Sequence, residues 1–430
     1  MTARPIPSEH PLMQRNLRLL PWWWVLRWVW LGEGIWVLYL TDERGLTLGE
    51  ALLFEAVFSA VVIVSELPTG MIADRFGRRV SLVVGTTAVV IAFFAFGVGS
   101  SFLVLLVAYA FFALAETSFS GADTAILYDS LRAVGRDRDF TVWHGRLNAL
   151  IALAIGGFTV AGSLMVHWWP LWAPILLSAA LSAPAILLAW LMTEPPRTDE
   201  RHTYLDTGRH AITFVRRNPA MLAAMVLMSV TTIAIASVSV FQQHFLRAAG
   251  IPVWGVGMFV AGQMLVAAVG SWISSPLGNW LGFRRTMWIM PLGSTIALAA
   301  AAPGHLALYP LFLFPALGWN VLFPHFAEYL ARRVTDSLRA SVMSIANIVG
   351  GLAAIAIVPL TGLGVDRLGF RTTVLILAAV LTSTAAVAFL AWARSPDPGE
   401  IDGSGPSEPG QDPGGRLVID APEAAPVPSR

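Results

Sequence analysis

Four charged side chains lie inside long apolar stretches: Arg27, Glu33, Glu55 and Glu116. An ionisable group within a membrane core costs about 2.5–3.5 kcal/mol on insertion scales, so such residues commonly carry protons or hold substrates. Glu33 is the first candidate for a proton carrier, because apolar surroundings favour the neutral, protonated form of a carboxyl group. Arg27 lies six residues before Glu33, a spacing that does not place the two on one helix face.

Plainer explanations for these charges stay open. Glu33 could be structural, either paired with Arg27 or hydrogen-bonded to a neighbouring helix. Glu116 and Glu55 are further candidates for proton coupling or substrate binding, and so is Arg27. Glu66 precedes a basic loop and is expected to belong to a gate.

That basic loop offers a second kind of chemistry, and it reads Gly70-Met-Ile-Ala-Asp74-Arg75-Phe-Gly77-Arg78-Arg79. An acid at a helix junction can accept backbone N–H groups from the N-terminus of a neighbouring helix, where the macrodipole favours negative charge. The arginines could pair with Asp123 and Asp129, or they could only face lipid phosphates.

The elements that position these residues are membrane helices. Of the 430 residues, 56% are hydrophobic and 13% are charged, whereas a soluble domain carries about 25% charged residues. The net charge of +1 gives no sign of the strongly basic surface that binds nucleic acid. The chain has no Cys, which excludes disulfides and Cys-ligated metals, and we expect no metal and no cofactor.

We predict twelve spans, since about 20 apolar residues cross a bilayer. Their expected ranges are 20–41, 49–70, 80–99, 102–122, 146–166, 170–192, 220–243, 253–274, 286–303, 306–328, 340–361 and 372–393. With the N-terminus inside, 23 arginines fall on the inner side and four outside. That bias is what the positive-inside rule predicts, so both termini are expected in the cytoplasm.

The expected organisation has five parts: a cytoplasmic N-terminus (1–19), a six-helix bundle (20–192), a connector (193–219), a second bundle (220–393) and a tail (394–430). The connector is rich in Arg, and its end at Arg209–Asn218 could form a short interfacial helix. The tail is rich in Pro, Gly, Ser and acids, so we expect it to be disordered.

The loop and its setting resemble the major facilitator superfamily. All six fixed positions of that family's signature, Gly-x-x-x-Asp-Arg-x-Gly-Arg-Arg, are matched by Gly70–Arg79, and the resemblance covers about residues 15–395. It implies an all-α membrane protein of two pseudo-symmetric six-helix bundles. It also implies a latch at the inner ends, with Asp74 facing the start of the eleventh span near Ser341 and the arginines reaching Asp123 and Asp129.

Two other strings echo the loop. Ser275–Arg285 stands where a second copy belongs, but Asn279 replaces the acid and Trp280 the first arginine. The string Gly362–Gly369 matches better by pattern, yet it falls on the outer side, and we interpret it as an ordinary turn.

The resemblance implies that spans 1, 4, 7 and 10 line a central cavity. Polar and aromatic candidates for that cavity are Gln263, Asn320, Asn347, Tyr109 and Trp319, although such residues more often bond or pack between helices. Gln242 and His244, near the outer end of the seventh span, could belong to an outer gate.

The function expected from these observations is secondary active transport of a small solute across the cytoplasmic membrane by alternating access. Proton-coupled efflux of a small, largely apolar compound is the first hypothesis, and proton-coupled uptake of a nutrient or metabolite is the second. A non-transporting membrane sensor is a remote alternative. No nucleophile–base set or phosphate-binding loop is visible, so we expect no enzyme. The expected partners are a small-molecule substrate, a proton or other ion gradient and the lipid bilayer, for a monomeric protein.

Overall fold

The computed structural model describes residues 10–195, 204–334 and 336–395. The tail expected to be disordered lies almost wholly outside this range, as does the middle of the connector. The helices of the first half are α1 His10–Arg27, α2 Trp36–Leu38, a π-helical turn η1 Tyr39–Glu43, α3 Leu48–Phe76, α4 Arg78–Val98, α5 Phe102–Phe119, α6 Ala122–Ala133, a 3-10 turn η2 Asp137–Asp139, α7 Phe140–Met165 and α8 Trp172–Leu191.

A connector helix, α9 Tyr204–Arg217, is present where the sequence predicts one, and it packs against the second half. The helices of that half are α10 Pro219–Ala248, α11 Val253–Leu281, α12 Phe283–Ala301, a 3-10 turn η3 Leu306–Leu308, α13 Tyr309–Ala331, α14 Asp336–Leu368 and α15 Phe370–Ala393. They run longer than the predicted spans at several ends, because a helix can continue beyond the apolar residues that mark its membrane core.

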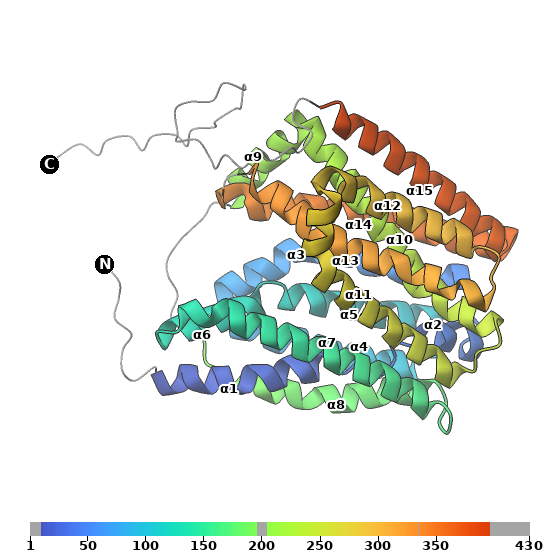
Figure 1. Ribbon diagram of the computed structural model, residues 1–430. Helices are drawn as coiled ribbons and strands as arrows, with labels where there is room; N and C mark the ends of the chain where they lie inside the picture. The colour runs from blue at the N-terminus through green and yellow to red at the C-terminus, as the bar shows by residue number, and fades with distance from the viewer. Residues whose placement is uncertain (1–9, 196–203, 335, 396–430) are drawn as a thin grey trace.

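The helices form two bundles in a pseudo-symmetric pair (Figure 1). In the first bundle α4 packs on α5 and α8, and in the second α11 and α12 pack on α13. Two helix pairs, α3 with α14 and α7 with α11, join the bundles. Ten helices within the described residues are long and apolar enough to cross a membrane, so the expected all-α membrane fold is confirmed. Neither α12 nor the first predicted span belongs to that set.

The first predicted span, 20–41, is wrong as a single helix. Helix α1 ends at Arg27, and residues 28–35 form a nonhelical segment before α2. Gly34 permits a close approach within this interruption, because a Cβ there would lie 2.7 Å from the Cα of Gly257 and 2.6 Å from the Ser163 hydroxyl. The segment therefore packs against both bundles, and contacts with neighbouring helices replace its own helical hydrogen bonds.

Three glycines with positive φ each form a one-residue turn between consecutive helices. Gly77 links α3 to α4, Gly282 links α11 to α12, and Gly369 links α14 to α15, with φ of 108°, 78° and 79°. A positive φ strains residues that carry a Cβ, so each turn favours glycine. The three strings that resemble one another in sequence thus share one turn geometry, and the third is part of that set.

The two bundles meet at one end. We call the end where α1 begins and α15 ends the basic end, because the Gly70–Arg79 loop lies there, and the other the opposite end. The ribbons lie together at the opposite end and diverge toward the basic end (Figure 1). Gly49 and Gly362 touch at the opposite end, since a Cβ on Gly362 would lie 2.7 Å from the Gly49 Cα.

Candidate functional site

Glu33 lies in the interrupted segment rather than on a helix. Its backbone carbonyl accepts a hydrogen bond from the Gln243 side chain of α10 at 3.0 Å. On the other side of the segment, the Leu31 N–H donates to the Ser178 hydroxyl of α8 at 3.0 Å. The segment is therefore braced by one side chain from each bundle.

The Glu33 carboxyl belongs to a half-buried acidic cluster. Glu55 of α3 is close enough to Glu33 for the two acidic charges to interact. The Tyr109 hydroxyl of α5 donates to Glu55 Oε1 at 2.7 Å. Three sequence candidates from three different elements are thus brought together, and Arg27 is not among their partners.

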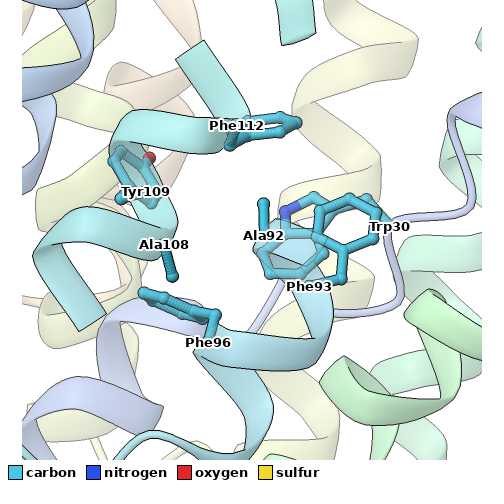
Figure 2. Close-up of a pocket in the computed structure, with 7 residues that line it drawn as sticks. All are labelled: Trp30, Ala92, Phe93, Phe96, Ala108, Tyr109 and Phe112. Atoms are coloured by element: carbon cyan, nitrogen blue, oxygen red, sulfur yellow. The ribbon is translucent and has the colours of Figure 1, made fainter. Parts of the chain in front are cut away.

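Aromatic rings surround this cluster on the side of the first bundle. A small pocket there is lined by Trp30, Ala92, Phe93, Phe96, Ala108, Tyr109 and Phe112 (Figure 2). Trp30 stacks on Phe93 with the ring centroids 4.6 Å apart, and Trp36 stacks on Tyr109 at 5.6 Å. Most of these rings are buried in the core of the first bundle, so they give the acids apolar neighbours.

Arg27 pairs with Asp123, which corrects the expected pairing of Asp123 with the loop arginines. Arg27 Nη2 lies 2.8 Å from Asp123 Oδ2, and the two side chains are 7% and 11% exposed. The guanidinium also lies 4.4 Å from the Phe119 ring centroid and 4.9 Å from that of Trp23. Glu116 lies near enough to interact electrostatically with both members of the pair.

Helix ends explain this pairing. Arg27 is the last residue of α1, and Asp123 lies in the first turn of α6, after α5 has ended and Gly121 has turned the chain with φ of 75°. Each charge therefore has the sign that its helix end favours. Two neighbouring helices are interrupted at the same depth, and one ion pair joins the interruptions.

The Gly70–Arg79 loop makes one of its expected contacts. Arg78 forms an ion pair with Asp129 of α6, within the first bundle. Arg79 lies over the Trp190 ring at 5.0 Å, and Arg75 lies over Phe76 at 5.4 Å. The side chain of Asp74 lies outside the described residues, so its expected contact near Ser341 stays a prediction.

A carboxylate missed by the sequence analysis anchors this loop. Glu194, just after α8, accepts hydrogen bonds from the backbone N–H groups of Arg78 and Arg79, both at 2.8 Å. An acid at the N-terminus of α4 is what the helix dipole favours. The only sequence signal is an acid following an apolar span, which is too common to single it out.

The remaining candidates bond within the second bundle. Gln263 of α11 accepts from Gln242 of α10 at 2.6 Å, and Asn320 of α13 accepts from Ser271 of α11 at 3.0 Å. The Trp319 indole donates to Thr232 at 3.3 Å. These contacts match the plainer explanation, in which such residues join helices, whereas the Asn347 side chain of α14 is exposed.

The family model described as the Major Facilitator Superfamily matches residues 33–358, which is more than half of the chain. The chain belongs to the major facilitator superfamily. The match includes the Gly70–Arg79 loop and the acidic cluster, and it ends within α14. A search of the curated proteins found no match.

Solved structures of major facilitator transporters share this fold. One is a bacterial homologue of the human lysosomal transporter Spinster, inward-facing and unoccupied, with a TM-score of 0.71, 18% identity, and coverage of 89% of this chain and 97% of that one. Another is the nucleoside transporter NupG, with a TM-score of 0.75, 14% identity, and coverage of 89% and 100%. A transporter of the POT family in complex with 5-aminolevulinic acid matches with a TM-score of 0.66 and 14% identity over 87% and 96%. At these identities the likeness shows the fold alone.

This major facilitator protein is closed at its opposite end by groups from both bundles. The Gly49 N–H at the start of α3 donates to Asp366 Oδ2 of α14 at 2.9 Å. Arg247 of α10 lies 3.5 Å from Asp42, and His244 is near enough to Asp42 and Asp366 to interact with their charges. The interpretation of Gly362–Gly369 as an ordinary turn is therefore wrong, because its acid caps a helix of the other bundle. The pattern carried this signal, and only its position in the topology argued against it.

Proposed function

We propose that this transporter couples solute movement to protons through Glu33 and Glu55. The observation that carries the proposal is the clustering of these two acids and Tyr109 beside the interruption of the first span. Two neighbouring carboxylates in an apolar region repel each other when both are ionised, so one of them readily holds a proton. A proton taken up there changes the charge of a segment that touches both bundles.

The way the bundles are joined supports alternating access. Hydrogen bonds and an ion pair close the opposite end, while the ribbons diverge toward the basic end. With the basic end in the cytoplasm, as the arginine bias predicts, this state is inward-facing. Rocking of the bundles would break the contacts of Asp366 and Asp42 and expose the acidic cluster to the other side.

Efflux of a small, largely apolar compound is the first hypothesis for direction and substrate. Tyr109 and Phe112 are partly exposed beside the acids, and they offer aromatic faces to such a compound. Proton-coupled uptake of a nutrient or metabolite stays the alternative. Both hypotheses use the same acids, and they differ in whether solute and proton move in opposite directions or together.

A proteoliposome assay tests the coupling. The purified protein is reconstituted with a lipophilic fluorescent dye that crosses protein-free bilayers only slowly, and dye movement is followed after a pH gradient is imposed. Opposite movement of dye and protons supports efflux, and movement in the same direction supports uptake. We expect Glu33→Gln to lose gradient-driven accumulation while keeping downhill exchange, because an amide cannot carry the proton.

The matched control is Asp137→Asn, which neutralises an exposed acid in the surface turn η2. It should leave gradient-driven movement close to the wild-type rate. Full gradient-driven transport by Glu33→Gln would end the assignment of Glu33 as the coupling residue.

A further inference from the structure

Gln243 is inserted into the hydrogen-bond ladder of the first span. The Glu33 carbonyl and the Val37 N–H are four residues apart, which makes them bonding partners in a continuous α-helix. Here the Gln243 amide stands between them. Its Nε2 donates to the Glu33 carbonyl at 3.0 Å, and its Oε1 accepts from the Val37 N–H at 3.2 Å.

The insertion is specific in its chemistry. An amide offers both a donor and an acceptor, and the types of the two partners allow only one orientation of the Gln243 side chain. The residue is 1% exposed, so both of its polar ends are buried and both are bonded. A side chain that enters a helical ladder in this way is a recognised cause of a sharp helix interruption.

The two partners belong to different bundles. Gln243 lies on α10 of the second bundle, and Glu33 and Val37 lie on the first span. The same segment touches the second bundle at Gly34, where a Cβ would lie 2.7 Å from the Gly257 Cα. These bonds therefore exist only while the opposite end is closed, and separation of the bundles there must withdraw the amide.

We propose that Gln243 is a positioning residue that ties closure of the opposite end to the shape of the first span. While that end is closed, the amide holds the ladder open and fixes the backbone of Glu33. When the bundles separate, the amide bonds to water, and the Val37 N–H bonds the Glu33 carbonyl. The span then gains a helical turn, which reorients Glu33. This device does not depend on which solute or ion the transporter moves.

The adjacent residue Gln242 supplies a matched control. It is also 1% exposed, but its partners, Gln263 and Tyr309, both lie in the second bundle. Its bonds persist when the bundles move as rigid bodies. Loss of the Gln242 amide should therefore lower stability without shifting the balance between closed and open states.

Distances between spin labels at the opposite end test the proposal. The chain has no Cys, so cysteines replacing Trp168 and Leu368 can be labelled without background. These positions lie on different bundles, and their side chains are 75% and 56% exposed. Distances are measured by pulsed electron resonance in nanodiscs of phosphatidylethanolamine and phosphatidylglycerol, without solute. Gln243→Leu should raise the ratio of separated to closed molecules about tenfold, as expected for the loss of one or two buried hydrogen bonds.

Two further measurements distinguish loss of the specific Gln243 hydrogen bonds from a general loss of stability. Gln243→Asn keeps the amide but is one methylene shorter, so it should raise the ratio of separated to closed molecules as Gln243→Leu does. If Gln243→Leu does not fold, Gln243→Asn provides the test. Hydrogen exchange in the peptide containing Val37 should be faster in Gln243→Leu than in Gln242→Leu. The proposal is overturned if Gln243→Leu leaves the distances unchanged, if Gln242→Leu shifts them equally, or if Gln243→Asn behaves as the wild type.

Discussion

The ion pair between Arg27 and Asp123 shows how much a single residue's role depends on distant partners. The two residues are 96 positions apart, and no local spacing links them. Arg27 was a candidate for coupling because it lies alone in an apolar stretch. In the structure Arg27 contacts a buried carboxylate and several aromatic faces. These contacts stabilise its charge inside an apolar bundle.

We expect Arg27→Met to destabilise the protein by about 3–5 kcal/mol, because it leaves Asp123 buried without its cation. The double variant Arg27→Met with Asp123→Leu should recover most of that loss. Thermal unfolding in detergent, followed by circular dichroism, measures both. Arg136→Met is the control, since the pair of Arg136 with Asp139 is 52% and 46% exposed and should contribute less than about 1 kcal/mol. A single Arg27 variant as stable as the control would contradict a structural role for the pair.

At the scale of helices, close approach between α3 and α14 closes the opposite end. Gly49 and Gly362 let the two backbones touch, and Asp366 then accepts a hydrogen bond from the Gly49 N–H in the first turn of α3. Small residues at such crossings are a general feature of membrane helices. This crossing joins the bundles mainly through backbone atoms and the N-terminal end of α3.

Gly362→Ala should favour separation of the opposite end, because the new Cβ would lie 2.7 Å from the Gly49 Cα and one helix must move. A cysteine replacing Leu48, which is 5% exposed, reports the change through its rate of reaction with N-ethylmaleimide. We expect that rate to rise several-fold. Gly350→Ala on the same helix is the control, since a Cβ there meets only the Ser229 hydroxyl at 3.6 Å. Equal rates in the two variants would show that the crossing does not control closure.

At the scale of the whole molecule, the distribution of charge predicts the orientation in the membrane, because arginines gather at the basic end. The loop that carries Arg75, Arg78 and Arg79 and the last turn of α9 with Arg216 and Arg217 lie there. The positive-inside rule assigns this end to the cytoplasm.

Labelling of intact cells with a membrane-impermeant maleimide checks the orientation. A cysteine replacing Trp168 at the opposite end should react, and one replacing Trp280 at the basic end should not. These side chains are 75% and 78% exposed, so burial does not explain a difference between them. Reaction at Trp280→Cys alone would reverse the assigned topology and, with it, the inward-facing interpretation of this state.

Composition and local sequence pattern are enough to predict the helices, the turn and the family. Apolar runs predicted the helices, and the spacing of Gly70, Asp74 and Gly77 predicted the turn and the family, because a positive φ and a helix end constrain residue type locally. The acids Glu33 and Glu55 were also visible, since a carboxyl group inside an apolar stretch stands out in any sequence.

Only the tertiary structure decided which partners those residues have. Gln243 and Gln242 are adjacent and chemically identical, yet one bridges the bundles and the other stays within its own. Asp366 resembled a turn residue until the crossing of α3 and α14 brought a helix N-terminus to it. The interruption at residues 28–35 likewise depends on bonds from α8 and α10, because a backbone leaves its own ladder only where other groups replace the lost hydrogen bonds.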